Sequence, residues 1–204
     1  MIDDALNMIQ SELAQFVELN GGNASSVKLD NIAEMENNAD ALTDSIIISL
    51  VNIEEESALK NISTVRRNQL TGSMEHLHPP VFLNLYILFS SVMAASGAAR
   101  YKNALNKLGL VIQFFQNRKI FTLNNSPSFS TDNSTELLKN LEKMKVHMDL
   151  YTLTFEQINH LWGSLGGKQV PFAMYKARLV EIKDEQVFKG TGVITEIQSR
   201  ETVN

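Results

Sequence analysis

The chain has 204 residues, of which 44% are hydrophobic and 20% are charged, with four prolines and no cysteine. This composition excludes a collagenous or wholly disordered chain, and the length favours one largish domain. Eighteen basic and twenty-three acidic residues give a net charge of −5, so the basic excess typical of nucleic-acid-binding proteins is absent. Without cysteine, disulfides, thiolate metal ligands and cysteine nucleophiles are excluded.

The N-terminus and one uncharged stretch bear on localisation. Residues 1–6 are acidic where a secretory signal needs basic residues, so we expect synthesis and assembly in the cytoplasm. Residues 76–99 contain no Lys, Arg, Asp or Glu, as a membrane span would. However, this stretch includes Pro79 and Pro80, and its apolar residues alternate with the period of a strand. A buried central strand is therefore favoured, and no membrane insertion is expected.

The first half of the chain predicts one helix and then strands. Apolar residues at positions 2, 6, 9, 13 and 16 follow the spacing of one helix face, and Asn20-Gly21-Gly22 ends the pattern. Val27 and Leu29 predict a short strand. Residues 45–53 are β-branched and apolar on both faces, which is typical of a central strand. Residues 57–72 are interpreted as a long connection that includes a pairing strand.

The second half begins with the strand at 81–92 and a second long amphipathic helix. Its predicted buried stripe is strengthened by further apolar positions and consists of Tyr101, Leu105, Leu108, Ile112 and Phe115, with Ala104, Val111 and Phe114. Residues 122–135 are polar and predict a mobile loop. A half-buried strand follows at 144–150, where apolar and charged residues alternate.

A short helix and a last strand complete the predicted elements. Thr154 and Gln157 match a capping box that begins the helix, and Gly166-Gly167 ends it. Residues 171–182 predict the last strand. This order of elements predicts an α+β fold, with a mixed, largely antiparallel sheet packed by two long amphipathic helices and one short helix. We expect a single domain at 1–186, with the mobile loop at about 122–135, and a polar C-terminal tail at 187–204.

Candidate metal ligands occur in one short run. Glu75, His76 and His78 place three potential ligands close together, and a His-x-His pair on a strand has both imidazoles on one face. The other histidines have no spacing relation to this run, and the prolines that follow favour an exposed turn. We therefore predict no metal centre and no cofactor.

The sequence also offers no convincing catalytic motif. Residues 163–169 superficially match a phosphate-binding loop, but Trp162 stands where its first glycine belongs and Gln169 where Ser or Thr binds magnesium. The segment follows a helix and is interpreted as a helix end. The adjacent acids at 3–4 and 54–56 are typical of helix starts and solvated strand ends. We predict that the chain is not an enzyme.

Two segments resemble signature segments of one family. They are residues 79–89, PPVFLNLYILF, and residues 154–178, TFEQINHLWGSLGGKQVPFAMYKAR. They look like the cap, or tail-terminator, family of extracellular contractile injection systems, the phage-tail-like particles that include the antifeeding prophage and the virulence-cassette particles. The start at residues 1–6 is similar as well, and the resemblance extends to about residue 182.

The resemblance implies a tail-terminator-like fold and a structural role. It implies a homo-hexameric ring that closes the inner tube and engages the last sheath layer, so the partners are the chain itself, the tube protein and the sheath protein, without nucleic acid. The subunit would become part of a phage-tail-like particle, released or envelope-associated. Two alternatives stay open: a baseplate or tail-completion adaptor of the same machine, or a small metal-dependent enzyme that uses Glu75, His76 and His78.

Interface residues are also expected from the resemblance. Trp162 and Tyr175 are expected to organise the junction between the short helix and the last strand. Arg66, Arg67 and Arg178 are expected to face neighbouring subunits.

Overall fold

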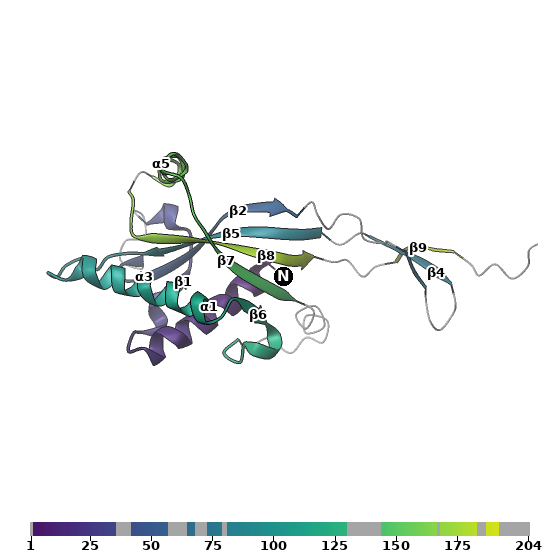
Figure 1. Ribbon diagram of the computed structural model, residues 1–204, viewed down its shortest axis with the longest axis horizontal. Helices are drawn as coiled ribbons and strands as arrows, with labels where there is room; N and C mark the ends of the chain where they lie inside the picture. Colours follow the sequence, from purple (N-terminus) through teal and green to yellow (C-terminus); the bar gives the residue numbers. More distant parts are fainter. Residues whose placement is uncertain are drawn as a thin grey trace, which may run out of the picture.

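The computed structural model describes residues 2–35, 42–56, 65–67, 73–78, 81–129, 144–166, 168–182 and 187–191. In these residues the strands form two sheets, one of six strands and one of three (Figure 1).

The six-stranded sheet has the order β1-β2-β5-β8-β7-β6. Its strands are β1 (Val27–Leu29), β2 (Ile46–Glu55), β5 (Val81–Ser91), β6 (Ile120–Thr122), β7 (Lys145–Tyr151) and β8 (Phe172–Ile182). β1 and β2 are parallel, and the other neighbouring pairs are antiparallel. The predicted mixed, largely antiparallel sheet is therefore confirmed. Both edge strands have only three residues, which limits unwanted pairing with other chains.

β5 occupies the middle of this sheet. It pairs with β2 on one side and β8 on the other over nearly its whole length. Leu85, Ile87 and Phe89 are fully buried on one face of the sheet, and Leu88 is fully buried on the other. Residues 81–91 of the uncharged stretch thus form a central strand, as predicted. In the part of the chain that the structure describes, no helix is long and apolar enough to cross a membrane.

Two long helices cover one face of the sheet. They are α1 (Ile2–Leu19) and α3 (Arg100–Asn117), and both lie below the sheet in the view of Figure 1. The core between them and the sheet is rich in aromatic rings. Phe115 is central, because its ring centroid lies 4.4 Å from that of Tyr175, 5.0 Å from that of Phe89 and 6.0 Å from that of Phe121. Offset and edge-to-face pairs of this kind add to the stability that burial alone provides.

The other face is partly covered by shorter elements. These are α5 (Phe155–Ser164) and the 3-10 turn η2 (Ile32–Glu34). Trp162 of α5 packs on Phe172 of β8, with ring centroids 5.4 Å apart. The predicted capping box is present, since Thr154 accepts from the Gln157 amide and Gln157 accepts from that of Thr154. Gly166 ends the helix in a left-handed conformation with φ +97°.

The buried face of α3 differs from the predicted one. Ala104, Val111 and Phe114 are buried with Phe115, whereas Tyr101, Leu105 and Ile112 of the predicted stripe are 57%, 44% and 42% exposed. The helix has two overlapping apolar stripes, and the one that faces the sheet brings both adjacent phenylalanines into the aromatic core. The prediction was therefore right for Phe115 and for the three strengthening positions, and wrong for Tyr101, Leu105 and Ile112, because both stripes satisfy helical spacing.

The predicted loop at 122–135 is also only partly a loop. Its first residue ends β6, and the 3-10 turn η4 (Leu123–Asn125) follows. Residues 130–135 lie outside the described residues. β6 was missed because a strand of three residues is too short for its alternation to be visible in the sequence.

The second sheet has the order β3-β4-β9 and consists of β3 (Val65–Arg67), β4 (Met74–Leu77) and β9 (Val187–Thr191). Both of its strand pairs are antiparallel. Figure 1 shows β4 and β9 beyond the ends of β5 and β8. β3 is the strand expected within 57–72, of which residues 57–64 and 68–72 lie outside the described residues. The first residues of the predicted tail form β9.

We predict that Phe89→Ala lowers the free energy of unfolding by about 3–5 kcal/mol, because it removes a fully buried ring from the aromatic core. Phe155→Ala is the matched control, since that ring is 88% exposed and its loss should change stability by less than about 0.5 kcal/mol. Urea denaturation measures both, and equal effects would contradict the assigned core.

Candidate interaction surfaces

The sheet face that α5 covers becomes polar away from that helix. On β8, Met174 is buried beneath α5, Lys176 is half-buried, and Arg178 is 44% exposed. His147 and Asp149 of β7 lie on the same face, as the predicted alternation requires. Charged side chains from several strands therefore meet on an open sheet surface, which we call the polar face.

Arg178 lies at the centre of the β7 half of the polar face. It stands opposite His147 in the strand register, and its guanidinium lies 3.3 Å from the His147 Nδ1. The same guanidinium forms an ion pair with Asp149, whose carboxylate is 3.7 Å from that imidazole nitrogen. Exposed ion pairs contribute only about 0–1 kcal/mol to stability. Arg178 is therefore accessible to a partner at little cost to the fold.

The β2 half of the polar face holds a second network. The Tyr86 hydroxyl donates a 2.6 Å hydrogen bond to Glu54, and the Lys176 ammonium lies 3.7 Å from the same carboxylate and 5.3 Å from the Tyr86 ring centroid. The hydrogen bond to Glu54 raises the pKa of Tyr86 above its ordinary value, burial adds to the rise, and Lys176 opposes it. This network joins β2, β5 and β8 across the surface.

A groove of about 300 Å³ separates the polar face from α5. Its walls are lined by Val51, Asn52, Glu54, Tyr86, Tyr151, Leu153, Gln157, Leu161 and Met174. The Tyr86 and Tyr151 rings meet edge to face, with centroids 5.1 Å apart. Glu54 is the one residue of this lining with a carboxylate, so the groove has a single acidic group rather than a carboxylate pair for acid–base catalysis.

The candidate metal ligands lie on or beside β4 in the second sheet. Glu75 and His76 are consecutive in the strand and therefore project to opposite faces, and His78 follows its end. Within the described residues, no group of three or more His, Asp or Glu side chains is placed to hold a metal ion.

Two of the expected interface residues lie in the neighbouring strand. Arg66 and Arg67 belong to β3, an outer strand of the second sheet, where the register sets them opposite Glu75 and Met74. The second sheet and the polar face thus carry the three arginines at separate places on the subunit.

Trp162 and Tyr175 lie on opposite faces of the six-stranded sheet. Trp162 is 4% exposed in the core beneath α5, and Tyr175 is 3% exposed in the core beneath α3. Burial raises the pKa of Tyr175. Their roles at an interface stay predictions, and any such role must act through the elements that these side chains support.

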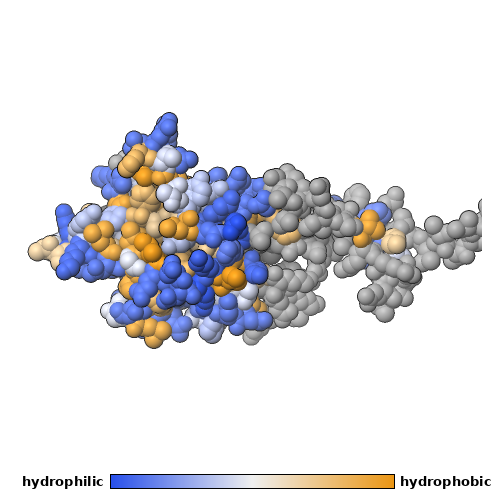
Figure 2. Space-filling view, viewed as in Figure 1, coloured by the Kyte–Doolittle hydropathy of each residue, from blue (hydrophilic) through white to orange (hydrophobic). Residues whose placement is uncertain are grey.

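Large apolar side chains are also exposed at several points. Phe155 at the start of α5 is 88% exposed, and Leu19 at the end of α1 is 78% exposed. Figure 2 shows hydrophobic groups scattered among hydrophilic ones over the region where Figure 1 draws α3. Exposed apolar groups thus also lie on α1 and α3, which together we call the helical layer.

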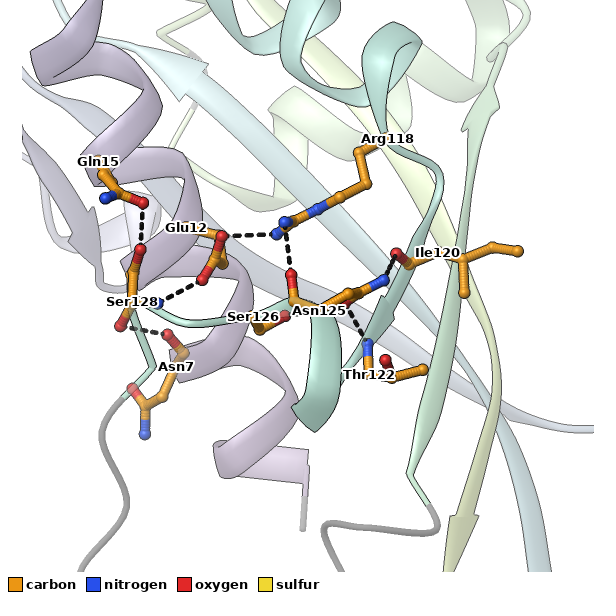
Figure 3. Close-up of polar contacts among 10 residues, drawn as sticks. Asn7, Glu12, Gln15, Arg118, Ile120, Thr122, Asn125, Ser126 and Ser128 are labelled. Atoms are coloured by element: carbon orange, nitrogen blue, oxygen red, sulfur yellow. Dashed lines mark hydrogen bonds and ion pairs between the residues drawn. The ribbon is translucent and has the colours of Figure 1, made fainter.

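One carboxylate is buried within the helical layer. Glu12 of α1 is 5% exposed and lies 2.8 Å from the Arg118 guanidinium, while its other oxygen accepts from the Ser128 amide at 2.7 Å (Figure 3). Arg118 also donates to the Asn125 carbonyl and stacks 4.4 Å from the Phe121 ring centroid. These contacts attach the segment after β6 to α1. All of them lie within the chain, so they indicate a structural role for Glu12.

A family model described as the Pvc16 N-terminal domain matches residues 4–196. Among curated proteins, no sequence matches the chain.

Two solved structures are similar in fold. The first is the tube-terminating cap of the anti-feeding prophage, with a TM-score of 0.65 and 13% identity over 98% of this chain and 61% of that one. The second is the sheath/tube terminator of an extracellular contractile injection system, PVC, in its extended state, with a TM-score of 0.53 and 13% identity over 78% of this chain and 50% of that one. The chain thus spans about half to three fifths of the length of these neighbours.

We predict that Tyr175→Phe reduces the loss of stability at alkaline pH. Because burial raises the pKa of Tyr175, the folded chain binds its proton more tightly than the unfolded chain, whose tyrosines titrate near pH 10. The free energy of unfolding should therefore fall as the pH rises above about 10, and less steeply in the variant. Urea denaturation between pH 8 and 11.5 measures the slope, and equal slopes would contradict the assignment.

We also predict that Glu12→Ala lowers the free energy of unfolding by about 3 kcal/mol, because Arg118 and the Ser128 amide lose their acceptor. The double variant Glu12→Leu/Arg118→Met should recover most of that loss, since an apolar pair replaces an ionic one. Lys107→Met is the control, because it removes an ion pair whose carboxylate, that of Asp44, is 57% exposed, and it should cost at most about 1 kcal/mol. No recovery in the double variant would contradict this account.

Proposed function

Because the chain belongs to the family of the Pvc16 N-terminal domain, we propose that it is a structural cap that terminates the tube of a contractile injection system. The family match over residues 4–196 carries this proposal. The likeness in fold to a tube-terminating cap and to a sheath/tube terminator supports it. In this role the subunit assembles in the cytoplasm, becomes part of a phage-tail-like particle and acts by contact, without catalysis.

The proposed cap is a closed ring of six identical subunits. A cyclic ring needs two different patches on each subunit, one for each neighbour. The ring closes the inner tube, and subunits of the last sheath layer contact its outer side. The polar face and the helical layer lie on opposite sides of the six-stranded sheet, so each subunit has distinct surfaces for its neighbours, the tube and the sheath.

Arg178, with Arg66 and Arg67, is proposed to face neighbouring subunits of the particle. The position of Arg178 supports this role. Its side chain is 44% exposed at the centre of the β7 half of the polar face, and its ion pair with Asp149 contributes little to stability. Charged groups at the rim of an interface contribute orientation and association rate more than affinity.

We predict that Arg178→Glu impairs assembly of the particle while the subunit stays folded. The introduced carboxylate repels Asp149, and it also repels any acidic group of a neighbouring subunit that pairs with the arginine. The measurement is the number of capped particles in a strain that carries the variant, with circular dichroism of the purified chain as the folding control. Lys168→Glu, an exposed charge reversal after α5, should assemble normally. Normal particles from Arg178→Glu would contradict this residue's role.

Cryo-electron microscopy of particles from a strain with a tagged copy tests the function itself. Tag density at the upper end, and tubes of uncontrolled length in a deletion strain, are the expected results. Density at the baseplate would replace the cap with the adaptor, and intact particles without the chain would contradict both.

A further inference from the structure

α5 lies on an excursion of the chain between two strands that pair directly with each other. β7 and β8 are antiparallel neighbours, and Tyr151 lies opposite Met174 where the two strands meet this excursion. Residues 152–171 leave the sheet between these positions, and Figure 1 shows α5 standing above the sheet. None of the strand pairs of β8 includes a residue of this excursion. The sheet therefore keeps its strand pairs whether or not α5 lies on it.

A single buried side chain anchors α5. Trp162 is the one buried residue of this helix, whereas seven residues of α1 are buried. Ile158 and Leu161 of α5 are only partly buried. α5 has 10 residues, and isolated helices shorter than about 12–15 residues are marginal in water, so tertiary packing has to hold them. The attachment of α5 to the sheet thus depends mainly on the contact of Trp162 with Phe172.

Two buried polar groups beneath α5 have no hydrogen-bond partner in the part of the chain that the structure describes. They are the Trp162 Nε1–H and the Ser90 hydroxyl. Ser90 lies opposite Phe172 in the register of β5 and β8, and Leu88, two residues earlier, shares a core with Trp162. Both groups therefore lie on the sheet face that α5 covers. A buried polar group without a partner destabilises the state that buries it, since water satisfies the group on exposure.

The surroundings of the anchor also permit movement. The groove of about 300 Å³ lies beside the helix, where Leu161 of α5 faces Tyr86 and Tyr151 of the sheet across it. Behind α5, Gly166 has a φ of +97°, and a Cβ at this position would meet no atom within 4 Å. Glycine adopts φ values of both signs. The chain can therefore change direction at Gly166 without a clash of side chains.

We propose that α5 is a detachable arm, which leaves the sheet as a unit while β7 and β8 stay paired. Detachment hydrates the Trp162 and Ser90 groups and uncovers Leu88 and Met174. Local openings of this kind occur at a lower free energy than global unfolding. A partner that binds one of the two states more tightly shifts the balance between them. This inference goes beyond the cap function and does not depend on it.

The fluorescence of Trp162 tests the detachment directly. It is the one tryptophan of the chain, so its emission reports on α5 without any substitution. In a urea titration, we expect the emission to shift to longer wavelength at a lower urea concentration than the loss of far-UV circular dichroism. That dichroism arises mainly from the long helices and the sheet. Coincident transitions would overturn the proposal, because α5 would then leave only on global unfolding.

Hydrogen exchange of the native chain tests whether α5 moves as a unit. The amides of Leu161, Trp162 and Gly163 should share one opening free energy, and their protection should be at least about tenfold lower than that of the β7–β8 amides. Equal protection of α5 and these strands would overturn the proposal. Protection that instead declines step by step toward the ends of α5 would indicate fraying, and it would overturn the movement as a unit.

A pair of serine variants tests the part played by the unpartnered hydroxyl. Ser90→Ala removes it, so α5 should open less often and its amides should exchange at least about fivefold more slowly. Ser49→Ala is the matched control. Ser49 lies on the same sheet face and is 5% exposed, but its hydroxyl accepts from the Ile32 amide at 3.0 Å and donates to the Asp30 carbonyl at 2.6 Å. This control should not slow exchange in α5. Unchanged or faster exchange in Ser90→Ala would overturn the proposal.

Discussion

The pairing of β5 on both sides is the constraint on which the rest of the structure depends. An interior strand has no backbone group left for water, and this one also separates two apolar cores. Its side chains therefore have to be uncharged on both faces, with Leu85 and Phe89 under the long helices and Leu88 under α5. α1 and α3 can lie together on one face, because α1 packs against β1 while α3 packs against β5 and β8 of the same sheet. The polar face lies where the sheet is no longer covered by α5, on β2, β7 and β8.

The residues that stabilise the fold and the residues that are exposed for contact thus lie in different parts of the subunit. Aromatic rings and the Glu12–Arg118 pair join elements that are far apart in the sequence, and they are buried or nearly so. Exposed groups such as Arg178 contribute little to the fold that carries them. This division is suited to a component whose proposed role is to meet several different neighbours, because a contact surface can change without loss of the core.

Much of the fold could be predicted because its signals are local. Strand alternation around His147, the capping box at Thr154 and the helical spacing of α1 each lie within one element, and all three are confirmed. The face of α3 that is buried could not be predicted in full. The helix has two apolar stripes with helical spacing, and which of them faces the sheet depends on long-range packing of the core. The grouping of Arg178 with Asp149 and His147 depends on the register of β7 and β8, which a single sequence does not reveal. Interface roles were also expected for Trp162 and Tyr175. The sequence did not reveal that both side chains are buried, because their burial depends on long-range packing.

The second sheet also has a mechanical consequence. β4 precedes β5 and β9 follows β8 along the chain, and Figure 1 shows β4 and β9 beyond the ends of those central strands. A pull on the second sheet therefore acts along the axes of β5 and β8. Hydrogen bonds between antiparallel strands are perpendicular to the strands. β5 and β8 are pulled in the same direction, because Val81 lies opposite Ile182, so the pull shears the bonds of the β2–β5 and β7–β8 pairs. The six-stranded sheet therefore resists tension along its strands better than peeling from an edge.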